Sequence, residues 1–452
     1  MERLLMKNLI DWKLSSRRKP LFLEGVRHVG KTWLLQEFGR RFFTNVAYFD
    51  FEKSPHLKDL FESTKNVDRI LQSLMMASCE RIVPGETLVI FDEVHAAPKA
   101  LGSLKYFSEN APDLHVACAS SLACIPSSEP SSFPVGKVSF LHLHPMCFTE
   151  FLHANGDEEL VRIIESVNAL DPVPEEFFDL LLERLKAYFV TGGMPEAVLK
   201  WTRDRDVPAM ENALSAILDD YEQDFTAHAR RALSSKISGI WNSLPTQLSG
   251  ENKKFTYQAV REGARAREYE AALDRLACSG LVRKVVRSTS PGLPMAAYDH
   301  ASAFKAYPAD VGILCRLSHL PPSVFAEGSR IFEASHGALL ETYVLQTLAM
   351  QFEVPARYWS RNNPYCEVEF LIQRENDVLP IEATAGRGKA GRGLRKFNEL
   401  FPDQVKLLVR FSLDNLNLDD NVLNIPLFMA DQADRLIGLA LKVRGQTGVV
   451  RQ

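Results

Sequence analysis

Gly25-Val26-Arg27-His28-Val29-Gly30-Lys31-Thr32 carries the strongest fold signal in this chain. It fits the phosphate-binding pattern G-x-x-x-x-G-K-[ST]. Residues 21–23 before it favour a short buried strand, and residues 33–38 after it favour an amphipathic helix. In this order of strand, glycine turn and helix, backbone amides can close on a triphosphate and the helix dipole adds positive potential.

Each position of this Walker A pattern has an expected task. We expect Lys31 to reach the β- and γ-phosphates of ATP and the hydroxyl of Thr32 to hold Mg²⁺. The residues expected to contact the nucleotide are Gly25, Val26, Arg27, His28, Val29, Gly30, Lys31, Thr32 and Trp33. The alternative is a tight turn with an exposed lysine, and the flanking strand and helix favour the phosphate site.

A second segment supports this interpretation. Residues 87–91 are β-branched and apolar, as in a strand buried on both faces of a parallel sheet, and they end in Asp92 and Glu93. Acids at the tip of such a strand face the crevice where open α/β sheets bind ligands. We expect Asp92, as the Walker B acid, to orient Mg²⁺ and Glu93 to polarise the attacking water. A solvated surface turn is the alternative.

A third strand is expected at residues 114–119, and it ends in Ser120 and Ser121. A small polar residue at this place can sense the γ-phosphate or hold the attacking water. We assign this task to Ser121, with an ordinary turn residue as the alternative. Residues 45–51 supply one more strand between the phosphate loop and the acidic pair.

The composition is that of an ordinary globular protein. Hydrophobic residues make up 46% of the chain, charged residues 24%, and the formal net charge is −4. This charge argues against coating of nucleic acid by the whole protein, but it leaves room for a local basic face. Residues 1–7 lack the apolar stretch of a signal peptide, and no run of about 18 apolar residues occurs. We therefore expect a cytoplasmic location and no membrane span.

Cysteine and histidine give no metal pattern. The seven cysteines form no C-x-x-C and are odd in number, so they are interpreted as reduced core residues. His142 and His144 alternate along an expected strand. They could bind a metal, but a polar strand face is the better interpretation.

The middle of the chain is expected to be mostly helical. Residues 254–286 follow the order helix, turn, helix and strand, which suits a winged-helix or helix-turn-helix unit. Its positive residues are Lys253, Lys254, Arg261, Arg265, Arg267, Arg275, Arg283 and Lys284. They could contact duplex DNA, or they could form the solvated face of a helical lid.

Three carboxylates near the C-terminus suggest a second site. Glu341 lies on an expected helix, and Glu369 and Glu382 lie in expected strands, as in nucleases whose carboxylates hold Mg²⁺. Those enzymes carry a lysine where this chain has Thr384, so we expect a scaffold without activity, although Lys389 could substitute. The glycine-rich basic segment 386–396 could follow a phosphate backbone or form a solvated loop.

A set of motifs in fixed order resembles one known family. They are the phosphate loop followed by Trp33-Leu34-Leu35, the Asp92-Glu93 strand, Leu104-Lys105-Tyr106-Phe107, the segment 132–138, Gly192-Gly193-Met194-Pro195-Glu196-Ala197-Val198 and Asp310-Val311-Gly312. The set is similar to that of prokaryotic AAA-type ATP-binding proteins with a C-terminal domain of unknown function. The resemblance implies a P-loop ATPase core, a winged-helix-like middle and a restriction-nuclease-like C-terminal domain.

The chain departs from that family at four places. Ser120-Ser121 stands where members usually have Gly-Ser, and Val94-His95 stands where many have Ile-Gln. Glu367-Val368-Glu369-Phe370 replaces E-V-D-F, and Ile381-Glu382-Ala383-Thr384 replaces I-E-V-K. The ATPase set is therefore complete in its main parts, whereas the nuclease-like set is degraded.

These observations predict an α/β protein built on a parallel P-loop NTPase sheet. We expect an AAA-type ATPase domain at 1–204, a helical or winged-helix-like domain at 205–290, a connector at 291–324 and a nuclease-like domain with a helical tail at 325–452. The expected function is slow ATP hydrolysis with Mg²⁺ as a conformational switch, coupled to DNA, a protein partner or further copies of the chain. Arg230 and Arg231 are candidates for an arginine finger. The alternatives are an ATP-regulated DNA-binding protein and an active Mg²⁺-dependent nuclease of a defence or mobile-element system.

Overall fold

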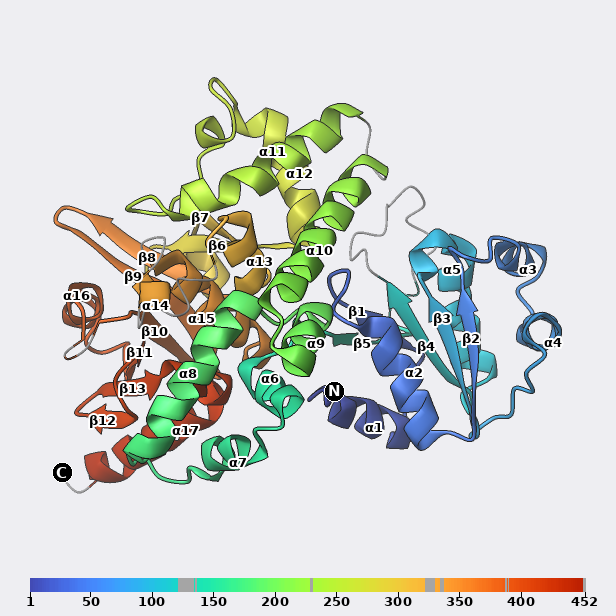
Figure 1. The fold of residues 1–452 in the computed structure, drawn as a ribbon, viewed down its shortest axis with the longest axis horizontal. Helices are drawn as coiled ribbons and strands as arrows, with labels where there is room; N and C mark the ends of the chain where they lie inside the picture. The colour runs from blue at the N-terminus through green and yellow to red at the C-terminus, as the bar shows by residue number, and fades with distance from the viewer. Residues whose placement is uncertain are drawn as a thin grey trace. The chain divides into compact units, whose positions relative to one another are not determined.

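The computed structural model divides the chain into two compact units. It describes residues 1–120, 134, 136–227, 231–321, 330–333, 337–386, 388 and 390–449. The first unit comprises Met1–His144 with Cys278–Gly280, and the second comprises Pro145–Ala277 with Leu281–Gln452. Figure 1 labels the elements of both.

The first unit is built on a parallel sheet of five strands. Its strands are β1 (Leu21–Glu24), β2 (Asn45–Asp50), β3 (Thr87–Asp92), β4 (His115–Ser120) and β5 (Ser139–His142). They lie in the order β2-β3-β4-β1-β5, and all pairs are parallel. The predicted parallel-sheet P-loop core is confirmed. Because β4 lies between β1 and β3, the ends of these three strands meet at one edge of the sheet.

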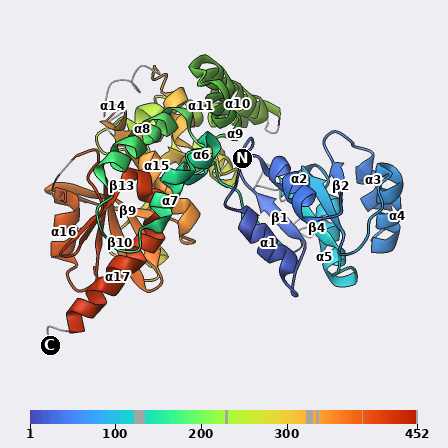
Figure 2. The same cartoon turned by 60° about the horizontal axis from the view of Figure 1, so that its bottom comes forward.

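Helices cover both faces of this sheet. They are α1 (Met6–Leu14), α2 (Lys31–Phe42), α3 (Leu57–Ser63), α4 (Val67–Ser78), the short 3₁₀ helix η1 (Val94–Ala96) and α5 (Pro98–Asn110). Figures 1 and 2 both show α3 and α4 beside the edge strand β2. The helix α2 packs on the sheet face opposite to the one that α3 and α4 cover. There, Gly39 of α2 lies against Val46 and Leu88.

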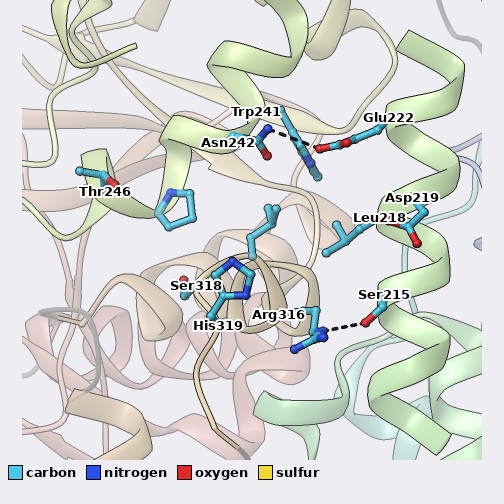
Figure 3. A pocket seen from close by; sticks show the side chains of 12 residues that line it. Ser215, Leu218, Asp219, Glu222, Trp241, Asn242, Thr246, Arg316, Ser318 and His319 are labelled. Carbon is cyan, nitrogen blue, oxygen red and sulfur yellow. Dashed lines mark hydrogen bonds between the residues drawn. The ribbon is translucent and has the colours of Figure 1, made fainter. Parts of the chain in front are cut away.

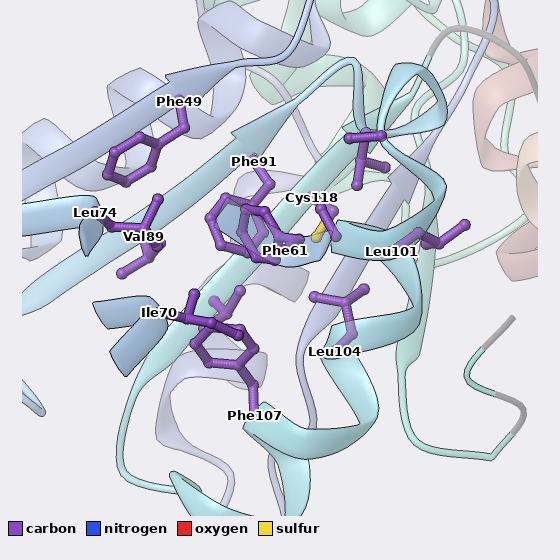
Figure 4. Close-up of a cluster of buried hydrophobic side chains, with 14 of the residues drawn as sticks. Phe49, Phe61, Ile70, Leu74, Val89, Phe91, Leu101, Leu104, Phe107 and Cys118 are labelled. Atoms are coloured by element: carbon purple, nitrogen blue, oxygen red, sulfur yellow. The ribbon is translucent and has the colours of Figure 1, made fainter. Parts of the chain in front are cut away.

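The core under α3, α4 and α5 fixes the strand that ends in Asp92 (Figure 4). The Phe91 ring, which is fully buried, lies 5.6 Å from the ring of Phe61 and 5.9 Å from that of Phe107. Phe49 and Phe51 also lie within 6.0 Å of it, centroid to centroid. Aromatic packing of this kind holds the residue directly before Asp92 in place.

The second unit contains a mixed sheet of eight strands in the order β12-β13-β11-β10-β9-β8-β6-β7. The strands are β6 (Val282–Ser288), β7 (Asp299–Pro308), β8 (Arg357–Asn362), β9 (Tyr365–Arg374), β10 (Asp377–Ala383), β11 (Leu408–Ser412), β12 (Asn417–Asp419) and β13 (Val422–Pro426). Strands β6 and β7 come from the middle of the chain and join the C-terminal strands through the β6–β8 pair. The middle and C-terminal segments therefore share one sheet.

The second unit also contains the following helices. They are α6 (Phe148–Asn155), α7 (Glu158–Ser166), α8 (Glu175–Thr191), α9 (Pro195–Asp204), α10 (Val207–Ala227), α11 (Arg231–Leu248), η2 (Tyr257–Ala259), α12 (Ala266–Cys278), η3 (Met295–Tyr298), α13 (Val311–Leu317), α14 (Arg330–Glu333), α15 (Ala338–Gln351), α16 (Arg392–Leu400), η6 (Leu427–Gln432) and α17 (Ala433–Val449). The predicted helix from Tyr257 is only a 3₁₀ turn, and Gly263 with φ 76° lies between it and α12. In the described part of the chain no helix is both long and apolar enough to cross a bilayer.

Two of the quoted motifs meet inside the second unit. The buried carboxylate of Asp310 accepts hydrogen bonds from the Gly193 amide at 2.7 Å and from the Ile313 amide at 3.0 Å. Gly192 has φ 69°, and a Cβ there would lie 2.2 Å from Asp310. Burial raises the pKa of Asp310, and the backbone donors oppose this effect. This clasp explains structurally why a glycine pair and an aspartate occur in the two motifs.

Candidate nucleotide-binding site

The phosphate loop joins β1 to α2. Two of its glycines have positive φ angles that other residues rarely adopt. Gly25 has φ 154°, and a Cβ on it would lie 2.3 Å from the carbonyl oxygen of Leu143. Gly30 has φ 91° and forms the N-cap of α2. His28 is also left-handed, with φ 69°. The loop thus turns sharply onto the N-terminus of α2, as a phosphate cradle requires.

Lys31 is buried and points back into this loop. Its Nζ donates to the carbonyl oxygens of Gly25 and Val26, each at 2.9 Å. Burial lowers the pKa of Lys31 to about 8, although the nearby carboxylates of Glu93 and Asp92 favour its charged form. An ammonium held at the loop by two neutral carbonyls is well placed to transfer its hydrogen bonds to a phosphate.

Thr32 and Asp92 lie in direct contact. The Thr32 hydroxyl donates to Asp92 Oδ2 at 2.7 Å, and the Glu93 amide donates to Asp92 Oδ1 at 3.1 Å. Hydroxyl and carboxylate oxygens are the kinds of ligand atom that suit Mg²⁺ at a bound nucleotide. No set of three or more His, Cys, Asp or Glu side chains in the described ranges is placed to hold a metal.

Tyr48 is a member of the site that sequence reasoning missed. Its hydroxyl donates to Asp92 Oδ2 at 2.7 Å from the neighbouring strand β2. Burial, together with Asp92, raises the pKa of Tyr48, so it stays a neutral donor. The pairing of Asp50 with Asp92 in adjacent parallel strands places Tyr48 there. That register was not readable from the chain.

Glu93 follows Asp92 in a left-handed conformation, with φ 47° and ψ 47°. Its Oε2 lies 3.2 Å from Nδ1 of His95. Nε2 of the same ring lies 3.5 Å from Oε1 of Glu52. The Ser120 hydroxyl, at the tip of β4, lies 3.4 Å from His95 Nδ1. The expected catalytic acid is thus part of a small polar cluster at the strand ends.

The structure places some of the remaining candidate residues and does not describe others. Ser121 and Arg230 lie outside the described residues, while Arg231 starts α11 in the second unit. Trp33 is 42% exposed on α2. Arg3, which no pattern singled out, donates from its guanidinium to the Val29 carbonyl at 2.8 Å and to the His144 carbonyl at 2.6 Å. Arg3 therefore braces the phosphate loop against the end of β5.

The basic segment of the middle region is less basic than its composition suggests. Lys253 is buried in an ion pair with Glu341, and Lys284 pairs with Asp274 at 3.3 Å. Arg283 donates to the Ala309 carbonyl at 2.7 Å. The exposed arginines of this segment are Arg261, Arg265 and Arg267.

The charges of Glu341 and Glu382 both act on Glu369, although Glu341 and Glu382 also have partners of their own. Glu341 accepts from Tyr307 at 2.6 Å and pairs with Lys253, and Lys305 lies 3.8 Å away. Glu382 accepts from the Gly391 amide at 3.0 Å and lies 3.4 Å from Arg410. Burial, with Glu341 as the strongest neighbouring charge, raises the pKa of Glu369. Lys389 lies outside the described residues.

A cavity of about 640 Å³ lies elsewhere, among helices of the second unit (Figure 3). One face of α10, one face of α11 and the end of α13 line it. Arg316 donates to the Ser215 hydroxyl at 2.8 Å, and Asn242 donates to Glu222 at 3.4 Å. Several of the polar side chains that line the cavity are hydrogen-bonded to one another. None of the phosphate-loop residues lines it.

Comparisons with known proteins agree with the loop geometry. Residues 17–152 match a family described as an AAA domain. Residues 182–324 and 336–428 match two domains of unknown function, DUF8612 and DUF4143. The match to the AAA domain covers most of the first unit, from residue 17 onward. No match was found among curated proteins.

Solved structures show weaker similarity. The Walker-type ATPase PABY2304 of Pyrococcus abyssi is 17% identical with a TM-score of 0.44, and the match covers 70% of this chain and 95% of that one. The ORC1 protein of Aeropyrum pernix, solved in complex with DNA, is 14% identical with a TM-score of 0.27, covering 71% and 91%. AMPPCP-bound DnaA from Aquifex aeolicus is 14% identical with a TM-score of 0.23, covering 60% and 86%.

Proposed function

We propose that this chain binds ATP with Mg²⁺, hydrolyses it slowly, and uses the two nucleotide states as a conformational switch. The observation that carries the proposal is the 2.7 Å contact between the Thr32 hydroxyl and Asp92. It joins the helix that follows the phosphate loop to the acid at the tip of β3. In P-loop enzymes these two groups share one Mg²⁺.

The residues of the first unit divide the work. Amides of the loop from Gly25 to Gly30 and the Lys31 ammonium bind the phosphates, while Thr32 and Asp92 hold Mg²⁺. When bound, the ion would offset negative charge on the phosphate oxygens. Glu93 accepts a proton from the attacking water. Tyr48 keeps Asp92 oriented from the neighbouring strand.

The test is phosphate release by the full chain with ATP and Mg²⁺, with and without duplex DNA. Lys31→Ala should abolish release, while Lys105→Ala, which removes an exposed lysine of α5, should leave it unchanged. Glu93→Gln should keep ATP binding but lose turnover. Failure of the unaltered chain to bind or hydrolyse ATP would reject the proposal.

Contact with duplex DNA is the second candidate, and the exposed residues Arg261, Arg265 and Arg267 favour it. They precede or begin α12, after which the strand β6 follows, an order that suits a winged-helix-like unit. Replacement of all three by glutamine should weaken salt-dependent binding, whereas Arg69→Gln, an exposed change in α4, should not. Equal binding by both variants would exclude this role.

The finer division of the chain belongs to the same proposal. We keep the ATPase region at 1–204, the winged-helix-like region at 205–290, the connector at 291–324 and the nuclease-like region from 325 onward. The ion pairs of Glu341 and Glu382 support a structural rather than catalytic use of the last region. Cleavage of DNA with Mg²⁺ or Mn²⁺ that is lost in Glu382→Ala would show instead that it is an active nuclease. A protein partner or a homo-oligomer would be indicated by Lys31-dependent activity that is indifferent to DNA.

A further inference from the structure

We propose that His95 is a positioning residue that orients the carboxylate of Glu93 for attack of water on ATP. The inference rests on the proposed ATPase function and extends it to a residue that the phosphate-loop and acidic-strand patterns do not include. It starts from an unusual arrangement: a buried imidazole ring has a carboxylate at each of its two nitrogens.

The contacts come from three neighbouring strand ends. Glu93 Oε2 lies 3.2 Å from Nδ1, and Glu52 Oε1, just beyond β2, lies 3.5 Å from Nε2. The Ser120 hydroxyl at the end of β4 approaches Nδ1 at 3.4 Å. The His95 side chain is only 8% exposed. Because each ring nitrogen has a carboxylate oxygen within 3.5 Å, rotation of the ring would change both contacts.

The short 3₁₀ turn that follows Glu93 brings His95 close to its carboxylate. Glu93 is left-handed, a conformation that costs energy for a residue with a side chain. The turn is held by the amide of Ala96, which donates to the Glu93 carbonyl at 3.0 Å. The Asp92 carboxylate also accepts from the Glu93 amide. The strained turn thus fixes the main chain of Glu93, and His95 fixes its side chain.

This arrangement serves proton transfer. Contact of Oε2 with His95 restricts the rotation of the Glu93 carboxylate, the group that accepts the proton of the attacking water in this proposal. The water O–H bond breaks as its oxygen bonds to the γ-phosphorus, and the bond from phosphorus to the bridging oxygen of ADP breaks. The released proton passes to Glu93. A base oriented by a neighbour, which a third group anchors in turn, is the general arrangement of such sites. Glu52 is the anchor here.

The experiment compares His95→Ala, His95→Gln and Glu52→Gln with the unaltered chain. We expect His95→Ala to lower kcat by about tenfold to a hundredfold, the range that small misplacements of a catalytic group produce. The KM for ATP should stay unchanged because the ring does not belong to the phosphate loop. His95→Gln, which keeps one amide donor, should recover part of kcat. Glu52→Gln should show a smaller loss. His56→Ala, an exposed histidine of the same unit, is the matched control.

A double variant separates positioning from general damage. In a Glu93→Gln background, single-turnover phosphate release should not fall further when His95→Ala is added. A further loss of similar size, or an unchanged kcat in His95→Ala, would overturn the proposal. If His95→Ala does not fold, as thermal unfolding would show, the Gln and Glu52 variants decide. Absence of hydrolysis in the unaltered chain would reject the ATPase function itself, which distinguishes the two failures.

Discussion

The hydroxyl of Thr32 lies 2.7 Å from a carboxylate oxygen of Asp92, although 60 residues separate them in the chain. The contact depends on strand order, because β1 and β3 are held apart by the single strand β4. Thr32 belongs to the first turn of α2 and Asp92 to the tip of β3. The two oxygens therefore meet at the edge of the sheet that is formed by the carboxyl ends of the parallel strands.

The first prediction concerns Asp92. Asp92→Asn removes the negative charge but keeps the side-chain size, so the free Mg²⁺ concentration needed for half-maximal ATP hydrolysis should rise at least about tenfold. A Mg²⁺ titration of phosphate release measures this. Tyr48→Phe removes only a hydrogen bond to the same carboxylate and should cause a smaller shift. An unchanged Mg²⁺ requirement in Asp92→Asn would remove this residue from the metal site.

The second prediction concerns Gly25. Gly25→Ala would bring a Cβ to 2.3 Å from the Leu143 carbonyl oxygen, so the loop must shift. We expect loss of ATP binding and a decrease of about 1–3 kcal/mol in the free energy of unfolding. Gly85→Ala is the matched control, because its φ is also positive at 80° but nothing lies within 4 Å of the added atom. Equal ATP binding by both variants would contradict the phosphate-loop geometry.

The third prediction follows from the pKa of Lys31, which burial lowers to about 8. Below this pH the ammonium is charged before the phosphate arrives, whereas above it ATP binding must take up a proton. Affinity for ATP should therefore be constant below about pH 8 and fall as the pH rises further. Titration calorimetry from pH 7 to 10 in buffers of different ionisation heat would detect the proton. Lys31→Met should bind weakly with no such dependence, and an equal pH dependence in that variant would assign it to another group.

The fourth prediction concerns the buried ion pairs of the second unit. Lys305 is fully buried and pairs with Glu367, and the charges of Glu341 and Glu367 raise its pKa against the opposing effect of burial. Lys305→Ala removes the fully buried cation that faces Glu367 and Glu341, so the free energy of unfolding should fall by about 3–5 kcal/mol.

The control for that change is Lys406→Ala. Lys406 pairs with Asp377 at 2.7 Å, but its side chain is 66% exposed. Its loss should cost about 0–1 kcal/mol. Urea unfolding of both variants makes the comparison. Similar costs at the two positions would mean that the Lys305 cluster is not held together by its charges.

The sequence predicts the parts of the nucleotide site that belong to one local pattern. The loop, its lysine and threonine, and the acidic pair after a buried strand are all readable because their spacing follows from a strand, a turn and a helix. The strands at 21–23, 45–51 and 87–91 are confirmed to within a residue or two. The remaining contacts depend on which strands are neighbours, and a single sequence does not contain that order.

Tyr48, His95 and Arg3 illustrate the limit. Tyr48 reaches Asp92 only because β2 and β3 pair in one register. Arg3 reaches the Val29 carbonyl only because the fold brings the segment before α1 next to the phosphate loop. His95 stands out in the sequence as a departure from the resembling family, but its contacts with Glu93 and Glu52 require the fold. In the second unit, the pairing of Lys305 with Glu367 depends on β7 and β9 belonging to the same sheet.

The Asp310 clasp also has a topological consequence. The Gly193 amide is hydrogen-bonded to the carboxylate of Asp310, 117 residues later in the chain. The segment between these two residues is therefore a long loop whose two ends are held together by this hydrogen bond. Changes in length within its surface turns leave the distance between those ends untouched. Evolution and protein engineering can therefore remodel this stretch while the clasp keeps its entry and exit together.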